Sequence, residues 1–231
     1  MRMLVAAAAT HSPAGTAPPR HRRRRERAAA PAPAPHKALN AILRSRVIAC
    51  LRARDGETAM KAAHAAVRGG VSVGLRCRGN RALRGGMASL EVVMSTPGAL
   101  EVICDLRRSY PSLTFGIGTV LNPEDARKAI RAGAQFLMSP GTVMEILHDL
   151  EEREVLYIPG VLTPTEVISA SSAGAEVVKV YPVSVMGGEA YMRALKKPFP
   201  SLPMVASQGI SIGIAIKNDE NMTTSWSIIF H

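Results

Sequence analysis

The sequence lacks the features typical of disulfide-bonded and metal-dependent proteins. Three cysteines, Cys50, Cys77 and Cys104, form no CxxC pair, and their odd number argues against a disulfide framework and favours a reducing compartment. The six histidines form no HxH or HxxxH pair. A metal-dependent mechanism therefore has no visible ligand set, although ligands can also be assembled from distant segments.

Long apolar runs are missing as well. No run approaches the roughly 20 apolar residues of a membrane span, and the short LVAAAA stretch near the start lacks the longer apolar region of a secretory signal. The 231 residues are 47% hydrophobic and 20% charged, which is typical of one soluble globular domain with room for an appendage. We therefore expect a soluble protein with no membrane partner.

Acidic residues are scarce at the N-terminus. Up to Lys37 there are eight Lys and Arg residues and one acid, Glu26, in a segment rich in Ala and Pro. This composition predicts a disordered, transit-like segment over residues 1–37, with the plastid (chloroplast stroma) as the expected destination and the mitochondrion as a less favoured one. A disordered basic tail on a cytoplasmic protein is the alternative.

The rest of the positive charge is also local. Residues 72–88 contain four arginines and no acid, and together with the N-terminal surplus of seven they account for the whole net charge of +11. The segment is Gly-rich and has no amphipathic period, so we predict a disordered insertion. RNA contact by these charges is an alternative, but no aromatic residues are interleaved with them, and we predict no nucleic-acid partner.

Short apolar segments that end in turn signals alternate with helical patterns along the rest of the chain. Helix starts are marked by Asn122-Pro123 and Thr163-Pro164, and Gly133 and Gly174 lie where these helices would end. Strands that alternate with helices predict a parallel sheet, and continuous apolar strands predict that it is covered on both faces. Seven strands fit a (βα)8 TIM-type barrel with one strand unaccounted for, while an open doubly wound sheet fits less well. The predicted strands are RVIACL, SLEVVM, LTFGIGTV, FLMSPG, VLYIPGV, EVVKVYP and PMVASQG.

The ends of the predicted strands carry an unusual set of polar residues, and in a barrel these ends face the active site. The set comprises Arg52, Glu91, Thr119, Ser139, Lys179 and Ser207. Lys179 lies inside a run of valines, and burial disfavours the charged form of an amine, which leaves a fraction able to attack a ketone. A lysine that snorkels to solvent or forms a purely structural ion pair is the alternative. Glu91 also lies in an apolar strand, so we expect the two charges to compensate each other.

These residues lie in motifs that resemble the 2-keto-3-deoxy-6-phosphogluconate (KDPG) and 4-hydroxy-2-oxoglutarate aldolase family. The resemblance extends from about Ala38 to Ile210 and is carried by FGIGTVLNPEDARKAIRAGAQFLMSPG, LYIPGVLTPTEVISASSAGAEVVKVYPVS and LKKPFPSLPMVASQGI. It implies that Lys179 of the VVKVYP motif forms a Schiff base with the substrate. It also implies that Glu91 of the LEVVMST motif is the general acid/base.

The resemblance further implies where the substrate binds, with two departures from the family pattern. Thr119 would contact the keto acid, and the backbone of three consecutive residues would line the same pocket: Ser139, Pro140 and Gly141. Where many members have an arginine four residues after the glutamate, this chain has Ser95, so we assign carboxylate or phosphate binding to Arg52. The usual Thr-Gly-Gly-Ile phosphate turn is replaced by Ser207-Gln208-Gly209-Ile210, which keeps a hydroxyl and one glycine.

The remaining predictions concern the binding partners and the C-terminal segment. The resemblance implies a small-molecule keto-acid substrate, no metal or organic cofactor, and a homotrimer. Residues 211–231 do not resemble the family, although Trp226 to Phe230 could fill a strand position, so we expect a barrel over residues 38–210 with a poorly closed junction between strands seven and eight. The function is then either a class I aldolase that releases pyruvate and an aldehyde, or a truncated, catalytically impaired homologue with at most an interaction role.

Overall fold

A computed structural model describes residues 36–68, 88–150, 155–208 and 222–230, all of which belong to one compact unit, Ala34–His231. For 222–230 only the backbone is described. The disorder predicted for residues 1–37 and 72–88 falls almost entirely outside the described residues, as does Gly209.

All seven predicted strands are present, and they pair in parallel in chain order. They are β1 (Val47–Ala53), β2 (Ser89–Val93), β3 (Thr114–Gly118), β4 (Phe136–Met138), β5 (Leu156–Ile158) with β6 (Gly160–Val161), β7 (Val178–Val180) and β8 (Met204–Ser207). The stretch predicted as the fifth strand is divided into β5 and β6 by Pro159, which has no N–H to donate to a ladder. Because the sheet order begins at β5 and ends at β6, this one stretch joins the two edges, and the sheet closes into the predicted barrel.

The eighth position in the barrel is irregular, as predicted, but it is not open. A ninth strand, β9 (Met222–Phe230), runs antiparallel to both β8 and β1 and pairs with them from Met204↔Phe230 to Ala53↔Met222. The poorly closed junction that we expected is therefore wrong. The physical reason is that the segment is rich in Thr, Ile, Trp and Phe, which favour strands, and both neighbouring edges offered unpaired backbone groups.

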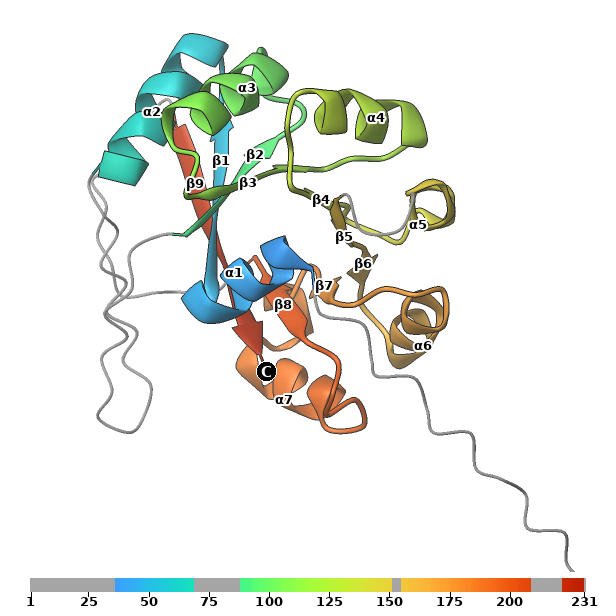
Figure 1. The fold of residues 1–231 in the computed structure, drawn as a ribbon. Helices are drawn as coiled ribbons and strands as arrows, with labels where there is room; N and C mark the ends of the chain where they lie inside the picture. Colours follow the sequence, from blue (N-terminus) through green and yellow to red (C-terminus); the bar gives the residue numbers. More distant parts are fainter. Residues whose placement is uncertain (1–35, 69–87, 151–154, 209–221, 231) are drawn as a thin grey trace, which may run out of the picture. The chain divides into compact units, whose positions relative to one another are not determined.

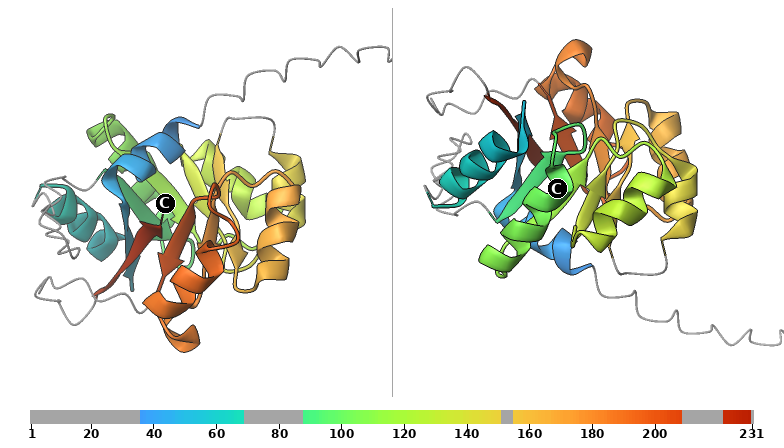
Figure 2. Two further views of the ribbon diagram at one scale, coloured as in Figure 1. Left: turned by 90° about the horizontal axis from the view of Figure 1, so that it is seen from below. Right: turned by 90° about the horizontal axis from the view of Figure 1, so that it is seen from above.

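Helices lie on the outside of the strands (Figures 1 and 2). They are α2 (Gly56–Arg68), α3 (Ala99–Ser109), α4 (Pro123–Arg131), α5 (Met144–Asp149), α6 (Pro164–Ser172) and α7 (Glu189–Lys196), with a 3-10 turn η1 (Ser184–Met186) before α7. Asn122 caps α4 by accepting from the Asp125 N–H, and Thr163 forms a full capping box with Glu166 at α6. Gly133 and Gly174 follow these two helices with φ of 95° and 100°, as their predicted role at helix ends requires.

The strands alternate between an outer apolar layer and the barrel interior. Outward residues pack against the surrounding helices, whereas inward residues of β1, β4, β5 and β8, with Val177 just before β7, form a separate cluster with helix α1 (Lys37–Ser45). That inner cluster contains Ala38, Leu39, Ile42, Ile48, Phe136, Met138, Leu156, Ile158, Val177 and Val205. Because α1 covers the amino end of the barrel, access to the interior is left at the carboxyl ends of the strands, where barrel active sites lie.

Candidate active site

Lys179 and Glu91 meet inside the barrel although their strands, β7 and β2, are not neighbours. The residues on either side of Lys179, Val178 and Val180, belong to the outer core, so alternation turns the lysine inward. Its Nζ lies 4.0 Å from Oε1 of Glu91, and the two side chains are only 9% and 2% exposed. Two opposite charges this deeply buried compensate each other, since neither would be tolerated alone.

Two groups of the described residues lie beside the Lys179 Nζ, an aromatic ring and the Glu91 carboxylate. Its Nζ also lies 5.5 Å from the centre of the Tyr181 ring, within the range of a cation–π contact. At 4.0 Å the carboxylate of Glu91 is beyond direct hydrogen-bond distance, which leaves room for a reacting group or a water between them. A buried amine with a carboxylate this close can act as a nucleophile and a proton shuttle.

Three other predicted residues lie at the carboxyl ends of their strands. Arg52 is exposed near the end of β1, on the inward side because Leu51 and Ala53 both belong to the outer core. Thr119 follows β3, is half-buried and has a φ of 60°, which is a strained conformation for a β-branched residue. Ser207 is the last residue of β8, is 8% exposed and alternates with the outward Ala206.

The loop after β4 reaches the site through its backbone. Gly160 is the register partner of Lys179, and its N–H donates to the carbonyl of Gly141 over 3.2 Å. A Cβ at Gly160 would lie 2.2 Å from the carbonyl carbon of Pro140, so only glycine allows this approach. The backbone of Pro140 and Gly141 therefore passes beside the strand position next to Lys179.

Ser139 points away from this site. It is fully buried, its hydroxyl donates to the carbonyl of Val120, and it accepts a hydrogen bond of 2.9 Å from Tyr157, which belongs to the outer core. Burial raises the pKa of Tyr157, although the bonds to Ser139 and to the Val143 N–H oppose the shift. The side chain of Ser139 is thus held in the outer layer.

Sequence reasoning missed Tyr181 and Gly118 as parts of the site. Tyr181 could have been found because it lies two residues after Lys179, and alternate residues of a strand share a face. Gly118 carries no chemical group, so no sequence signal connects it with Glu91. Its position against the Glu91 carboxylate is visible only in three dimensions.

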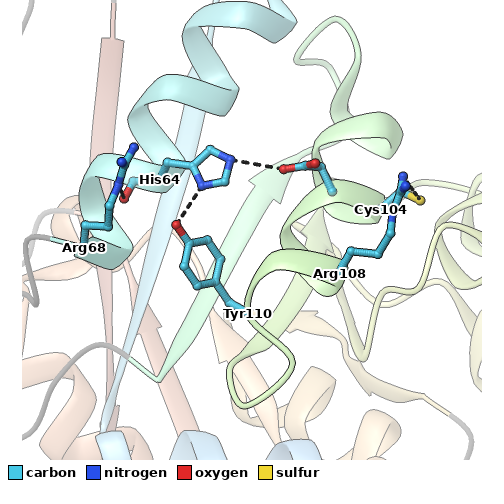
Figure 3. A network of polar contacts seen from close by, with 6 residues as sticks. His64, Arg68, Cys104, Arg108 and Tyr110 are labelled. Carbon is cyan, nitrogen blue, oxygen red and sulfur yellow. Dashed lines mark hydrogen bonds and ion pairs between the residues drawn. The ribbon is translucent and has the colours of Figure 1, made fainter.

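Other notable features of the described residues lie outside the barrel. His64 of α2 lies 2.8 Å from the hydroxyl of Tyr110 and 3.1 Å from Asp105 of α3, which ties the two helices together (Figure 3). A surface groove of about 260 Å³ lies between α4 and α5. No set of three or more His, Cys, Asp or Glu side chains in the described ranges could hold a metal, and no helix there is long and apolar enough to span a membrane.

Sequence comparison relates the chain to aldolases. Residues 39–218 match the family model described as KDPG and KHG aldolase. The chain is 35% identical over 128 residues to the 2-dehydro-3-deoxy-phosphogluconate aldolase of Pseudomonas aeruginosa, which covers 55% of this chain and 58% of that protein. It is 33% identical over 127 residues to the KHG/KDPG aldolase of Escherichia coli, covering 55% and 60%. The chain thus spans about three fifths of the length of these relatives.

Solved structures agree with the sequence comparison. A 4-hydroxy-2-oxoglutarate/2-dehydro-3-deoxyphosphogluconate aldolase is similar with a TM-score of 0.63 and 32% identity, covering 77% of this chain and 80% of that one. A KDPG aldolase of Legionella pneumophila, in which pyruvate was captured as a covalent carbinolamine, is similar with a TM-score of 0.59 and 25% identity, covering 74% and 76%. A cage designed by fusing symmetric oligomeric domains is also similar, with a TM-score of 0.60 and 25% identity over 71% of this chain and 55% of that one.

Proposed function

Because the chain belongs to the KDPG and KHG aldolase family, we propose that it is a class I aldolase that cleaves a 2-keto-4-hydroxy acid to pyruvate and an aldehyde. One observation carries the proposal: the buried pair of Lys179 and Glu91 inside the barrel, with Nζ and Oε1 4.0 Å apart. The substrate would be 2-keto-3-deoxy-6-phosphogluconate or 4-hydroxy-2-oxoglutarate, the compounds named for similar proteins.

The chemistry follows from an amine beside a carboxylate. The Lys179 amine adds to the C2 ketone, and the carbinolamine loses water to form a protonated imine. The electron pair of the C3–C4 bond then moves toward this imine, the C4 hydroxyl gives up its proton, and the aldehyde leaves an enamine behind. Protonation of the enamine at C3 and hydrolysis of the imine release pyruvate and restore the amine. Glu91 moves the proton in these steps, and the imine serves as the electron sink, so the proposed route uses no metal or organic cofactor.

Binding of the keto acid is assigned to the groups at the carboxyl ends of the strands. The exposed Arg52 guanidinium can take the carboxylate in a bidentate pair, and the Thr119 and Ser207 hydroxyls can donate to substrate oxygens. Arg52→Gln should therefore raise the pyruvate concentration that half-saturates imine formation by on the order of tenfold or more, the loss of a hydrogen bond to a charged group. An unchanged half-saturating concentration would remove Arg52 from the site.

Borohydride reduction of the purified full chain in the presence of pyruvate tests the proposal. One reduced pyruvate adduct should appear on the peptide that contains Lys179, and Lys179→Arg should show none because arginine keeps its proton. Lys196 is a suitable internal comparison, since its ammonium donates to three backbone carbonyls and burial lowers its pKa. Among the described residues it forms no ion pair with a carboxylate. Label on Lys196, or no label on a folded protein, would favour the impaired homologue instead.

We also propose that the chain forms a homotrimer. Support comes from the family resemblance and from the similar cage that was built from symmetric oligomeric domains. Light scattering after size exclusion should give a mass three times that of the 24.6 kDa chain. A monomer mass at concentrations used for activity assays would contradict the proposal.

A further inference from the structure

Beyond Thr114, the inward face of β3 carries no side chains. Phe115 and Ile117 point outward into the core, and the residues that alternate with them, Gly116 and Gly118, have no side chain to place inside the barrel. Both neighbouring strands use this space. The ring of Phe136 from β4 lies against Gly116, and the carboxylate of Glu91 from β2 lies against Gly118.

The fit at Gly118 is closer than any side chain would allow. A Cβ there would lie 1.4 Å from Oε1 of Glu91 and 2.4 Å from its Cδ, whereas real Cβ contacts under 3.0 Å essentially do not occur. The backbone itself does not require glycine, because φ at this position is not in the left-handed region and the Gly118 carbonyl accepts a regular hydrogen bond from the Met94 N–H. Space is therefore the reason for glycine at 118.

The direction in which Glu91 leans connects this space with the chemistry. The register partner of Glu91 on β3 is Gly116, yet its carboxylate lies over Gly118, two residues nearer the carboxyl end of the barrel. That lean brings Oε1 to 4.0 Å from Nζ of Lys179. A side chain at 118 would occupy the space that the Glu91 carboxylate now fills. Apart from Lys179, this carboxylate has no polar partner among the hydrogen bonds and ion pairs of the described residues.

We propose that Gly118 is a positioning residue: the absence of its Cβ seats the Glu91 carboxylate at the distance from Lys179 that proton transfer requires. This inference rests on the proposed aldolase function. Gly118→Ala displaces the carboxylate by at least the overlap with the new methyl group. Misplacement of a catalytic group by about 1 Å can cost on the order of 10²-fold in rate. We expect turnover to fall by that factor, with a much smaller change in the substrate concentration for half-maximal rate.

A compensating substitution separates positioning from general damage to the barrel. Glu91→Asp shortens the side chain by one carbon–carbon bond, about 1.5 Å, and withdraws the carboxylate from the space above Gly118. In the Glu91→Asp background, Gly118→Ala should therefore lower turnover less than about threefold, against about 10²-fold in the parent chain. Gly116→Ala is the comparison on the same face, because its Cβ would meet the ring and the backbone carbonyl of Phe136 instead of the Glu91 carboxylate. Its effect should be the same with either acid at position 91.

Two separate readouts distinguish a failure of this inference from a failure of the proposed function. If borohydride and pyruvate leave no adduct on Lys179 of the parent chain, the aldolase proposal fails. A crystal structure of Gly118→Ala still tests whether Gly118 positions the carboxylate. The distance from Oε1 of Glu91 to Nζ of Lys179 should exceed 4.0 Å in this variant and should be unchanged in Gly116→Ala. A folded Gly118→Ala variant with an unmoved carboxylate, or with turnover near that of the parent, would overturn the inference.

Discussion

Breaking the Lys179–Glu91 pair should destabilise the fold more than breaking any surface ion pair. Glu91→Gln leaves the Lys179 amine, 9% exposed, without its compensating charge, and Lys179→Met leaves the Glu91 carboxylate, 2% exposed, in the same position. Methionine matches the lysine side chain as far as Cε and fills that space with an apolar group. The double variant removes both charges and leaves no unpaired ion.

The magnitude follows from distance and burial. Two unit charges 4.0 Å apart attract by about 4 kcal/mol at an effective dielectric constant of ~20. Leaving one partner of a buried pair alone typically costs about 3–5 kcal/mol, whereas replacing both is often close to neutral. Each single variant should therefore lose about 3 kcal/mol or more of unfolding free energy. The double variant should be more stable than either single variant, so the coupling between the two changes would be large.

Urea unfolding of the four proteins in one buffer measures this coupling, and the turnover of Glu91→Gln should fall by on the order of 10²–10⁴ in the same preparations. The exposed pair of Lys61 and Glu57 is the matched control. Its atoms are closer, 2.5 Å apart, but the side chains are 75% and 78% exposed, so solvent screening should leave its coupling small. Additive effects at Lys179 and Glu91, or equal coupling in the two pairs, would refute the view that burial makes this pair strong.

Three further predictions concern strain, pH and targeting. Thr119→Gly should raise the unfolding free energy by about 1 kcal/mol, because relief of the backbone strain at a φ of 60° exceeds the entropic cost of glycine. The same change should lower kcat/KM, and unchanged stability would argue that the backbone is not strained. Hydrogen bonds from the backbone of Thr163 and Leu162 hold the pKa of Glu166 below its usual 4.5, so the contribution of Glu166 to stability should be full above pH 4.5 and decrease below it. Urea titrations at several pH values measure this dependence, and Glu166→Gln should remove it. A fluorescent protein fused behind residues 1–37 should enter plastids; cytosolic fluorescence would favour a basic tail.

Much of the barrel could be predicted because its signals are local. Asn122 and Thr163 mark helix starts through side chains that accept a hydrogen bond from the N–H three residues later, and these signals do not depend on the rest of the fold. The strands were equally visible because they are continuous apolar runs. Parallel pairing followed from the helices between them, since a crossover connection forces neighbouring strands to run in the same direction.

The direction of β9 could not be predicted in this way. Its Thr, Trp and Ile residues indicate a strand, but strand propensity is the same in both directions. Because β9 pairs with β8 on one side and with β1 on the other, its orientation depends on two partners that are far away in the sequence. The antiparallel direction places the end of β9 at the amino end of the barrel, because Phe230 is paired with Met204, the first residue of β8.

The residues of the candidate site also differ in how far the sequence could predict them. Lys179 and Glu91 stood out because a charge inside an apolar strand is costly and needs a reason, which the partner supplies. Ser139 had the same apparent position at a strand end, but a hydroxyl is inexpensive to bury once it has a partner, and Tyr157 and the Val120 carbonyl provide two in the outer layer. Gly118 could not be predicted from the sequence at all, because it contributes only the space that it leaves for Glu91. Sequence patterns therefore locate groups whose burial is expensive, whereas groups that act through shape or through inexpensive hydrogen bonds require the structure.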